Sequence, residues 1–171
     1  MKILLIYQSK TGFTKKYANW IAEELKCDIE KISHIPKINF SHYDFVIFGS
    51  RIHAGRIDRL NKIKQLNLGK KLILFATGAT PEETNSIMEV WNSNLTEEER
   101  KIIKHFYFPA GLNYEKMGFF DKTMMKMASM MLEKRDNKSN EDIGMQNSIQ
   151  KSYDISSKER IKPLIEYIQS L

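Results

Sequence analysis

Short apolar runs that alternate with amphipathic helical segments constrain the fold of this chain more than any other feature. The first run, Ile3–Tyr7, is uninterrupted and rich in strand-forming residues, which predicts a strand buried on both faces. After a polar turn that contains Gly12, apolar residues recur at helical spacing from Phe13 to Leu25, with charged residues on the other faces. The chain therefore opens with a strand, a tight turn and a helix.

The same alternation continues and predicts four more strands. The second strand, at residues 28–32, is short, whereas the runs at residues 45–48, 72–75 and 106–111 are rich in apolar residues. Between the third and fourth strands, the spacing of Ile57, Leu60, Ile63 and Lys64 predicts a helix. A helical crossover of this kind makes the two strands that it joins parallel.

Further helices are expected in the second half of the chain. One is predicted at residues 82–91, and Thr96 with a glutamate three positions later is a capping-box signature for another. Residues 156–171 carry an apolar stripe at helical spacing. Because Pro163 suits only the beginning of a helix, the regular part of this last helix is expected to begin near Ile161.

Strands that alternate with helices across short turns predict a parallel sheet covered by helices on both faces, which is the doubly wound α/β architecture. At 171 residues, the chain has the size of one domain. A domain of this size buries roughly 70% of the surface of its unfolded chain. We therefore expect a single domain that spans residues 1–171, with a polar loop at residues 137–150.

Composition narrows the classes of function. Hydrophobic residues make up 42% and charged residues 28% of the chain, as in ordinary globular proteins. The single cysteine, Cys27, excludes an internal disulfide framework and a multi-cysteine metal site, which favours a reducing compartment. The first apolar run is too short for a secretory signal, and no run reaches the ~20 residues of a transmembrane helix. A cytoplasmic protein is expected.

The net charge of +6 does not by itself identify a partner. The lysines are dispersed along the chain, and no nucleic-acid-binding motif accompanies them. We expect no nucleic-acid partner and no metal site.

The turn after the first strand carries the strongest chemical signal. It consists of Ser9, Lys10, Thr11, Gly12, Phe13 and Thr14. Three hydroxyl side chains therefore surround a glycine at the start of a helix, where free backbone N–H groups and the helix dipole attract anions. The chain contains neither the triphosphate motif G-x-x-x-x-G-K-[ST] nor the dinucleotide motif G-x-G-x-x-G. The turn is therefore predicted to bind a monophosphate.

Two further segments are expected as loops at the same edge of the sheet, after the strands at residues 45–48 and 72–75. The candidate binding residues are Ser50, Arg51, Ile52, His53, Ala54 and Gly55 in the first and Thr77, Gly78 and Ala79 in the second. Open α/β sheets bind ligands at the carboxyl ends of their strands. With the phosphate loop, these segments predict one composite ligand site.

The phosphate loop resembles that of the flavodoxin family, [ST]-x-T-G-x-T, with Phe13 in place of a frequent asparagine. The resemblance covers nearly the whole chain and implies a flavodoxin-like fold with sheet order 2-1-3-4-5 and non-covalent binding of flavin mononucleotide (FMN). The usual large aromatic residue is missing between Arg51 and Gly55, so the residue that stacks on the flavin stays open. His53 either packs on the flavin or is an ordinary loop histidine. Arg51 and Arg56 either place positive charge near the flavin or are solvated loop residues.

A methionine-rich segment begins at Met117 and ends at Leu132. Drawn as a helix, it is amphipathic, and its apolar stripe consists of Phe120, Met124, Met127 and Met131. Two interpretations remain open. The stripe packs on the domain as an additional helix, or it is an exposed face that contacts a partner or a membrane surface.

The run that begins at Phe119 and ends at Met127 resembles a helix start, aromatic-Asp-Lys/Arg-x-Met, of flavodoxin-like protoporphyrinogen IX dehydrogenases that use menaquinone. This resemblance implies an FMN-dependent oxidoreductase that oxidises protoporphyrinogen or a related tetrapyrrole with a quinone as acceptor, at the inner face of the membrane. No catalytic side chain is required, because the flavin carries the redox chemistry. The alternatives are an electron carrier that docks on a partner reductase and a binding module without flavin.

Overall fold

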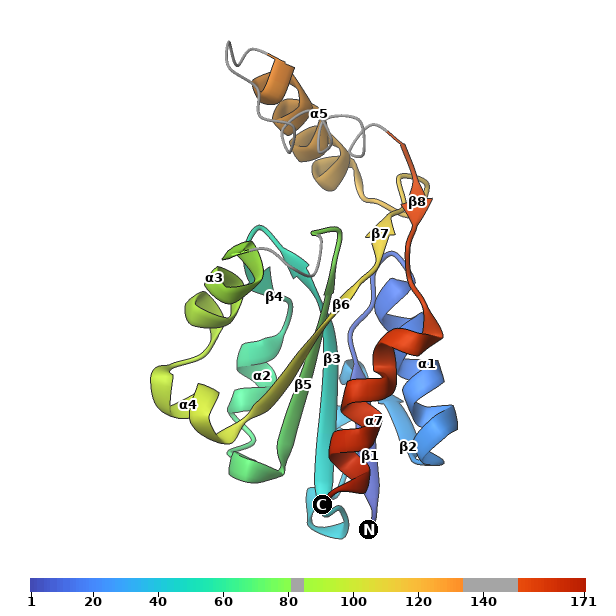
Figure 1. Cartoon of the computed structure of the whole chain (residues 1–171), viewed down its shortest axis with the longest axis vertical. Helices are drawn as coiled ribbons and strands as arrows, with labels where there is room; N and C mark the ends of the chain where they lie inside the picture. Colours follow the sequence, from blue (N-terminus) through green and yellow to red (C-terminus); the bar gives the residue numbers. More distant parts are fainter. Residues whose placement is uncertain (81–84, 134–150) are drawn as a thin grey trace.

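The computed structural model of the protein describes residues 1–80, 85–133 and 151–171 (Figure 1). Its main sheet has parallel strands in the order β2-β1-β3-β5-β6. These strands are β1 (Ile3–Tyr7), β2 (Asp28–Lys31), β3 (Phe45–His53), β5 (Leu72–Gly78) and β6 (Lys104–Pro109). Counted among themselves, they follow the order 2-1-3-4-5, so the predicted doubly wound five-stranded sheet is confirmed.

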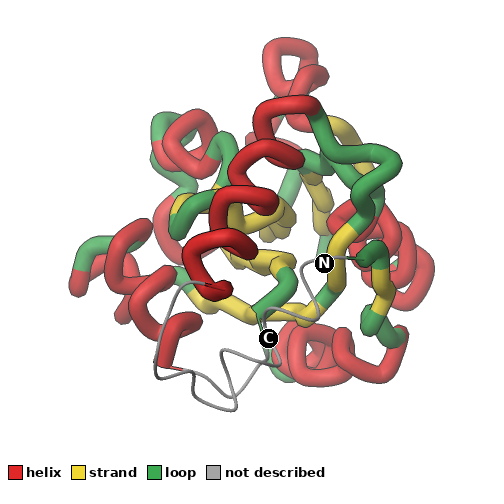
Figure 2. The backbone as a smooth tube through the Cα atoms, turned by 90° about the horizontal axis from the view of Figure 1, so that it is seen from above, coloured by secondary structure: helices red, strands yellow, loops and turns green. Residues whose placement is uncertain are grey.

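Helices cover both faces of this sheet (Figure 2). The helices α1 (Phe13–Leu25) and α7 (Lys162–Gln169) lie on one face, and α2 (Leu60–Lys64) and α3 (Asn85–Asn94) lie on the other (Figure 1). α4 (Glu97–Ile102) precedes β6. Among the described residues there are also four 3₁₀ turns, at Ile32–Lys37, Phe40–His42, Gly69–Lys71 and Lys158–Ile161.

Alternate residues of the buried strands build two cores, one under each helical layer. On the first face, Leu5 of β1 packs in one cluster with Tyr17 of α1 and Leu164 of α7. On the second face, Leu4 packs in one cluster with Leu60 of α2 and with residues of α3. Since neighbouring strand residues point to opposite faces, an uninterrupted apolar strand supplies both cores. Each fully buried large apolar side chain contributes about 1.5–3 kcal/mol.

The segment after Phe48 differs from the prediction. Residues 49–53 were expected in a loop, but β3 continues to His53, because its residues pair with the neighbouring strand β5 as far as Arg51 and then with β4. Ala54 and Gly55, both at positive φ, then turn the chain into β4 (Arg56–Ile57), which pairs antiparallel with β3. The predicted helix that begins at Ile57 is therefore wrong at its start, and only Leu60–Lys64 is helical.

Helix boundaries that depend on local chemistry agree with the sequence. Thr96 and Glu99 form the predicted capping box at the start of α4. Pro163 lies in the first turn of α7, directly after the 3₁₀ turn that ends at Ile161, where a proline is tolerated. α3 begins at Asn85, and the predicted helical residues 82–84 lie outside the described part of the chain. The predicted loop at residues 137–150 also lies outside it.

A second, two-stranded sheet lies beyond the end of β6. Gly111, predicted in the fifth strand, belongs instead to β7 (Gly111–Leu112), which pairs antiparallel with β8 (Tyr153–Asp154). Gly111 has a φ of 140°, and a Cβ atom there would lie 2.2 Å from the carbonyl oxygen of Tyr153. Only glycine fits this approach of two backbones.

The helix α5 (Phe119–Glu133) confirms the predicted methionine-rich helix and lies beyond the carboxyl edge of the sheet, at the top of Figure 1. Of the predicted apolar stripe, Phe120 is 70% exposed, Met127 59% and Met131 70%. Met124, the fourth residue of the stripe, is 38% exposed, so the stripe is largely an exposed face. Asp121 is the buried residue of the first turn and is turned toward the domain.

Candidate functional site

A cavity of about 370 Å³ lies between the carboxyl edge of the sheet and α5. Its walls come from the start of α1, the β3–β4 hairpin, the end of β5, the β6–β7 connection and α5. The lining residues are Thr11, Phe13, Arg51, Ile52, His53, Ala54, Gly55, Thr77, Gly78, Ala79, Thr80, Ala110, Gly111, Leu112, Met117, Asp121, Met124 and Met125. Apolar walls with a few polar groups are typical of small-molecule and cofactor sites.

The cavity brings together the three segments that were predicted to form one site. The predicted residues in its lining are Thr11, Phe13, Arg51, Ile52, His53, Ala54, Gly55, Thr77, Gly78 and Ala79. Those outside the lining are Ser9, Lys10, Gly12, Thr14 and Ser50. The carboxyl ends of β3 and β5 meet at this edge because the two strands are parallel neighbours.

The phosphate loop is a tight turn that closes on the start of α1. Gly12 has a φ of 102°, a left-handed conformation that favours glycine, and it is the N-cap residue of the helix. Its backbone N–H donates to the hydroxyl of Ser9 at 3.2 Å, and its carbonyl accepts from the amide of Lys16 at 3.0 Å. The N–H groups of the first helical turn have no partner within the helix, so they are available to an anion.

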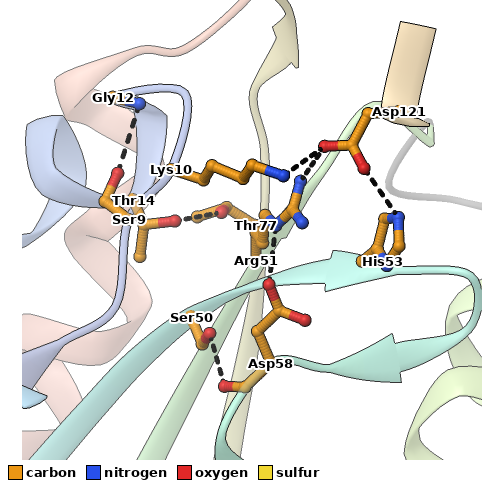
Figure 3. Close-up of polar contacts among 10 residues, drawn as sticks. All are labelled: Ser9, Lys10, Gly12, Thr14, Ser50, Arg51, His53, Asp58, Thr77 and Asp121. Carbon is orange, nitrogen blue, oxygen red and sulfur yellow. Dashed lines mark hydrogen bonds and ion pairs between the residues drawn. The ribbon is translucent and has the colours of Figure 1, made fainter. Parts of the chain in front are cut away.

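Three more of the predicted hydroxyl residues are engaged within the protein (Figure 3). The hydroxyl groups of Thr14 and Thr77, both in 2% exposed residues, lie 2.8 Å apart and tie the start of α1 to the end of β5. The buried hydroxyl of Ser50 donates to the carbonyl of Asp58 at 2.7 Å and holds the β3–β4 hairpin. The side chain of Ser50 therefore stabilises the hairpin and does not line the cavity.

Asp121 is the charged centre of the site, and the sequence interpretation did not include it among the binding residues. One carboxylate oxygen accepts from Lys10 Nζ at 3.0 Å and from an Arg51 guanidinium nitrogen at 3.1 Å. The other lies 3.2 Å from His53 Nε2 (Figure 3). Burial by itself raises the pKa of Asp121, but the hydrogen bonds from Lys10 and Arg51 outweigh it and hold the pKa below its usual value.

The two arginines near the β3–β4 hairpin have different surroundings. Arg51 lines the cavity and also donates to the carboxylate of Asp58 at 2.7 Å, so two carboxylates share its charge. Arg56 donates to the carbonyl of Ser93 at 2.6 Å and does not line the cavity. The prediction that these arginines place positive charge near the flavin therefore fits Arg51, which lines the cavity, and does not fit Arg56.

The second half of the chain contributes site residues that sequence reasoning missed. These are Ala110, the β7 residues Gly111 and Leu112, and Met117, Met124 and Met125 in and before α5, together with Asp121. An aspartate inside a methionine-rich apolar helix was the one available signal. Its partners are 111 and 70 positions away along the chain, so the contact itself could not be read from the sequence.

A doubly wound parallel sheet with a ligand-sized cavity at the carboxyl ends of β3 and β5, and with a hydroxyl-rich loop at the start of α1, defines a flavodoxin-like α/β protein. The sequence profile of the flavodoxin domain matches residues 4–140. The chain therefore belongs to the flavodoxin domain family.

Several known proteins are similar to parts of this chain. An uncharacterized protein of Methanocaldococcus jannaschii is 36% identical over 87 residues, which are 47% of this chain and 57% of that protein. The flavodoxin-like domain-containing protein BilS of Clostridioides difficile is 34% identical over 88 residues, 48% of this chain and 50% of BilS. The matches thus span about half the length of these curated relatives. An oxidised flavodoxin of Bacillus cereus shares 19% identity at a TM-score of 0.42, over 63% of this chain and 84% of that one.

Proposed function

We propose that this protein binds FMN non-covalently and uses it in redox chemistry. The observation that carries the proposal is the shared cavity, in which the anion-binding start of α1 and two sheet-edge segments meet. Membership of the flavodoxin family supports the same cofactor. A binding module without flavin remains the alternative that a first experiment separates.

The residues present fit FMN. A cavity of about 370 Å³ lies within the range of roughly 300–1,000 Å³ of small-molecule sites. At Gly12, a Cβ atom would have only Lys116 Nζ within 4 Å, at 3.8 Å, so no backbone atom blocks the approach of a phosphate on that side. Phe13, Ile52 and Leu112 give the cavity apolar surface for a flat ring.

Each part of the cavity has a separate task in this proposal. Ser9, Thr11 and the first amides of α1 hold the phosphate, and the hairpin at His53–Gly55 and the segment Thr77–Ala79 flank the ring with backbone groups. Bound FMN supplies hydride and electron transfer, which none of these side chains provides. Ile52 and the methionines limit water at the ring, and Arg51 adds positive charge that Asp58 and Asp121 moderate.

For the reaction, we propose oxidation of protoporphyrinogen or a related tetrapyrrole, with a quinone as electron acceptor. Met117, Met124 and Met125 line the cavity with adaptable apolar surface, which suits a large flat substrate. The test measures flavin-dependent protoporphyrinogen oxidation by the purified protein with a menaquinone analogue. Turnover supports the enzyme, whereas absence of turnover in a protein that binds FMN rejects this substrate.

An electron carrier is the second candidate, because the exposed face of α5 offers a docking surface beside the cavity. A carrier exchanges electrons rapidly with a partner reductase and has no small substrate of its own. Stopped-flow measurement of flavin reduction by reductases and by small reductants distinguishes the two candidates. A protein that stays colourless with added FMN would exclude both.

We also propose that the exposed face of α5 contacts the inner face of the membrane. In the described part of the chain, no helix has the length and hydropathy needed to cross a bilayer. Phe120 and Met127 are exposed, so a glutamate at either position should weaken binding to vesicles that contain acidic lipids, because it removes apolar area and adds a charge that the lipids repel. Met88 of α3 is 65% exposed and offers a matched control for the same substitution. Equal binding of all variants would reject the membrane contact.

A further inference from the structure

Residues 113–121, which lead from β7 into α5, run along the phosphate loop. Asp121 accepts a hydrogen bond from Lys10 at 3.0 Å. A Cβ atom built on Gly118 would lie 3.3 Å from Lys10 Nζ, and a Cβ atom built on Gly12 would lie 3.8 Å from Lys116 Nζ. The ammonium groups of both lysines therefore lie at the contact between this segment and the loop.

The two lysines differ in what balances their charge. Lys10 belongs to the phosphate loop, but Asp121 neutralises it. Within the described residues, no carboxylate pairs with Lys116, although its ammonium lies beside Gly12. Gly12 caps the start of α1, where the helix dipole is positive. Two positive groups that meet without a carboxylate repel each other, and an anion between them relieves the repulsion.

The position of Lys116 depends on contacts of its own segment. Its backbone N–H donates to the side chain of Asn113 at 3.1 Å, which shapes the turn. At the other end, Asp121 anchors the segment through Lys10, Arg51 and His53. Asp121 is 7% exposed, so water competes little with these contacts.

We propose that Lys116 binds the phosphate of FMN and that Asp121 is the positioning residue that holds Lys116 over the phosphate loop. This inference rests on the proposed binding of FMN. In the phosphate loop, Asp121 neutralises the charge of Lys10. Lys116 then completes the cofactor site by supplying a positive charge from residues 113–121. Occupancy of the flavin site and docking of α5 become thermodynamically linked.

The first test compares FMN with riboflavin, which lacks the phosphate. Flavin fluorescence titrations should show that Lys116→Gln weakens FMN binding about five- to tenfold and leaves riboflavin binding unchanged. Lys122→Gln removes the same charge from an exposed position of α5 and should change FMN binding less than about twofold. Unchanged FMN affinity in Lys116→Gln, or equal losses for both flavins, would overturn the role of Lys116.

The second test is a double-mutant cycle for the positioning role. If Asp121 holds the segment in place, Lys116→Gln should weaken FMN binding less than about twofold in an Asp121→Asn background. The same five- to tenfold loss in both backgrounds would overturn the role of Asp121. A wild-type protein that binds riboflavin and FMN equally overturns the contact with phosphate. A protein that binds neither overturns the proposed function itself.

Discussion

The buried hydroxyl pair of Thr14 and Thr77 allows a quantitative test of how the site is held together. Both residues are 2% exposed, and their hydroxyl oxygens lie 2.8 Å apart. Replacing either threonine with valine keeps the shape but leaves the other hydroxyl buried without its partner, which costs about 1–3 kcal/mol. Replacing both removes the two polar groups together and should cost less than either single change.

The assay is urea unfolding of Thr14→Val, Thr77→Val and the double variant, without added flavin so that ligand binding does not contribute. In a domain of this size, each kcal/mol also lowers the melting temperature by about 2–4 °C. Thr11→Val is the control, because Thr11 lines the cavity and its stability change should stay within about 0.5 kcal/mol. If the double variant loses the sum of the two single losses, the hydroxyls do not act as a pair.

Three further predictions concern stability and reactivity. Burial raises the pKa of Asp121, but its cationic partners lower it more, so its contribution is full above the usual carboxyl pKa of about 4 and is lost as pH falls through the lower folded value. Urea midpoints of wild type should therefore fall more steeply than those of Asp121→Asn below about pH 4, and parallel curves would contradict this. Gly111→Ala should separate β7 from β8, seen as lost cross-strand NMR contacts at Tyr153, whereas Gly55→Ala, with no atom within 4 Å of its Cβ, should keep them. The pKa of Cys27 is raised to about 11, mainly by burial and also by the neighbouring carboxylate of Asp28. Alkylation at pH 8 should therefore be about a hundredfold slower than for a free thiol. A rate near that of free cysteine would contradict the raised pKa of this half-buried thiol.

The sequence alone determined the layers of this protein. The apolar run at Ile3–Tyr7 and the helical spacing at Phe13–Leu25 are local patterns, and a strand buried on both faces has few alternatives to a parallel sheet between helices. The cap at Thr96 and the early position of Pro163 are also local, because each depends on a few neighbouring backbone groups. These features were predicted correctly.

The orientation of the site residues was decided by tertiary contacts. β3 extends to His53 because β5 offers backbone partners as far as Arg51 and β4 pairs with the last two residues, although Gly49 and Ser50 suggested a loop. The same extension turns the Ser50 hydroxyl toward Asp58, away from the cavity. Pairing between strands depends on a neighbour distant in sequence, so residue types in one segment cannot reveal it.

The phosphate loop and the methionine-rich helix show the same contrast between local sequence patterns and tertiary contacts. The sequence placed hydroxyls and Gly12 at the start of α1, because a helix start attracts anions wherever it lies. Only the tertiary structure brought Asp121 to Lys10, 111 positions away, and left Phe120 and Met127 of α5 exposed. An amphipathic pattern fixes which side chains share a face, whereas the packing of the whole chain decides which face is covered.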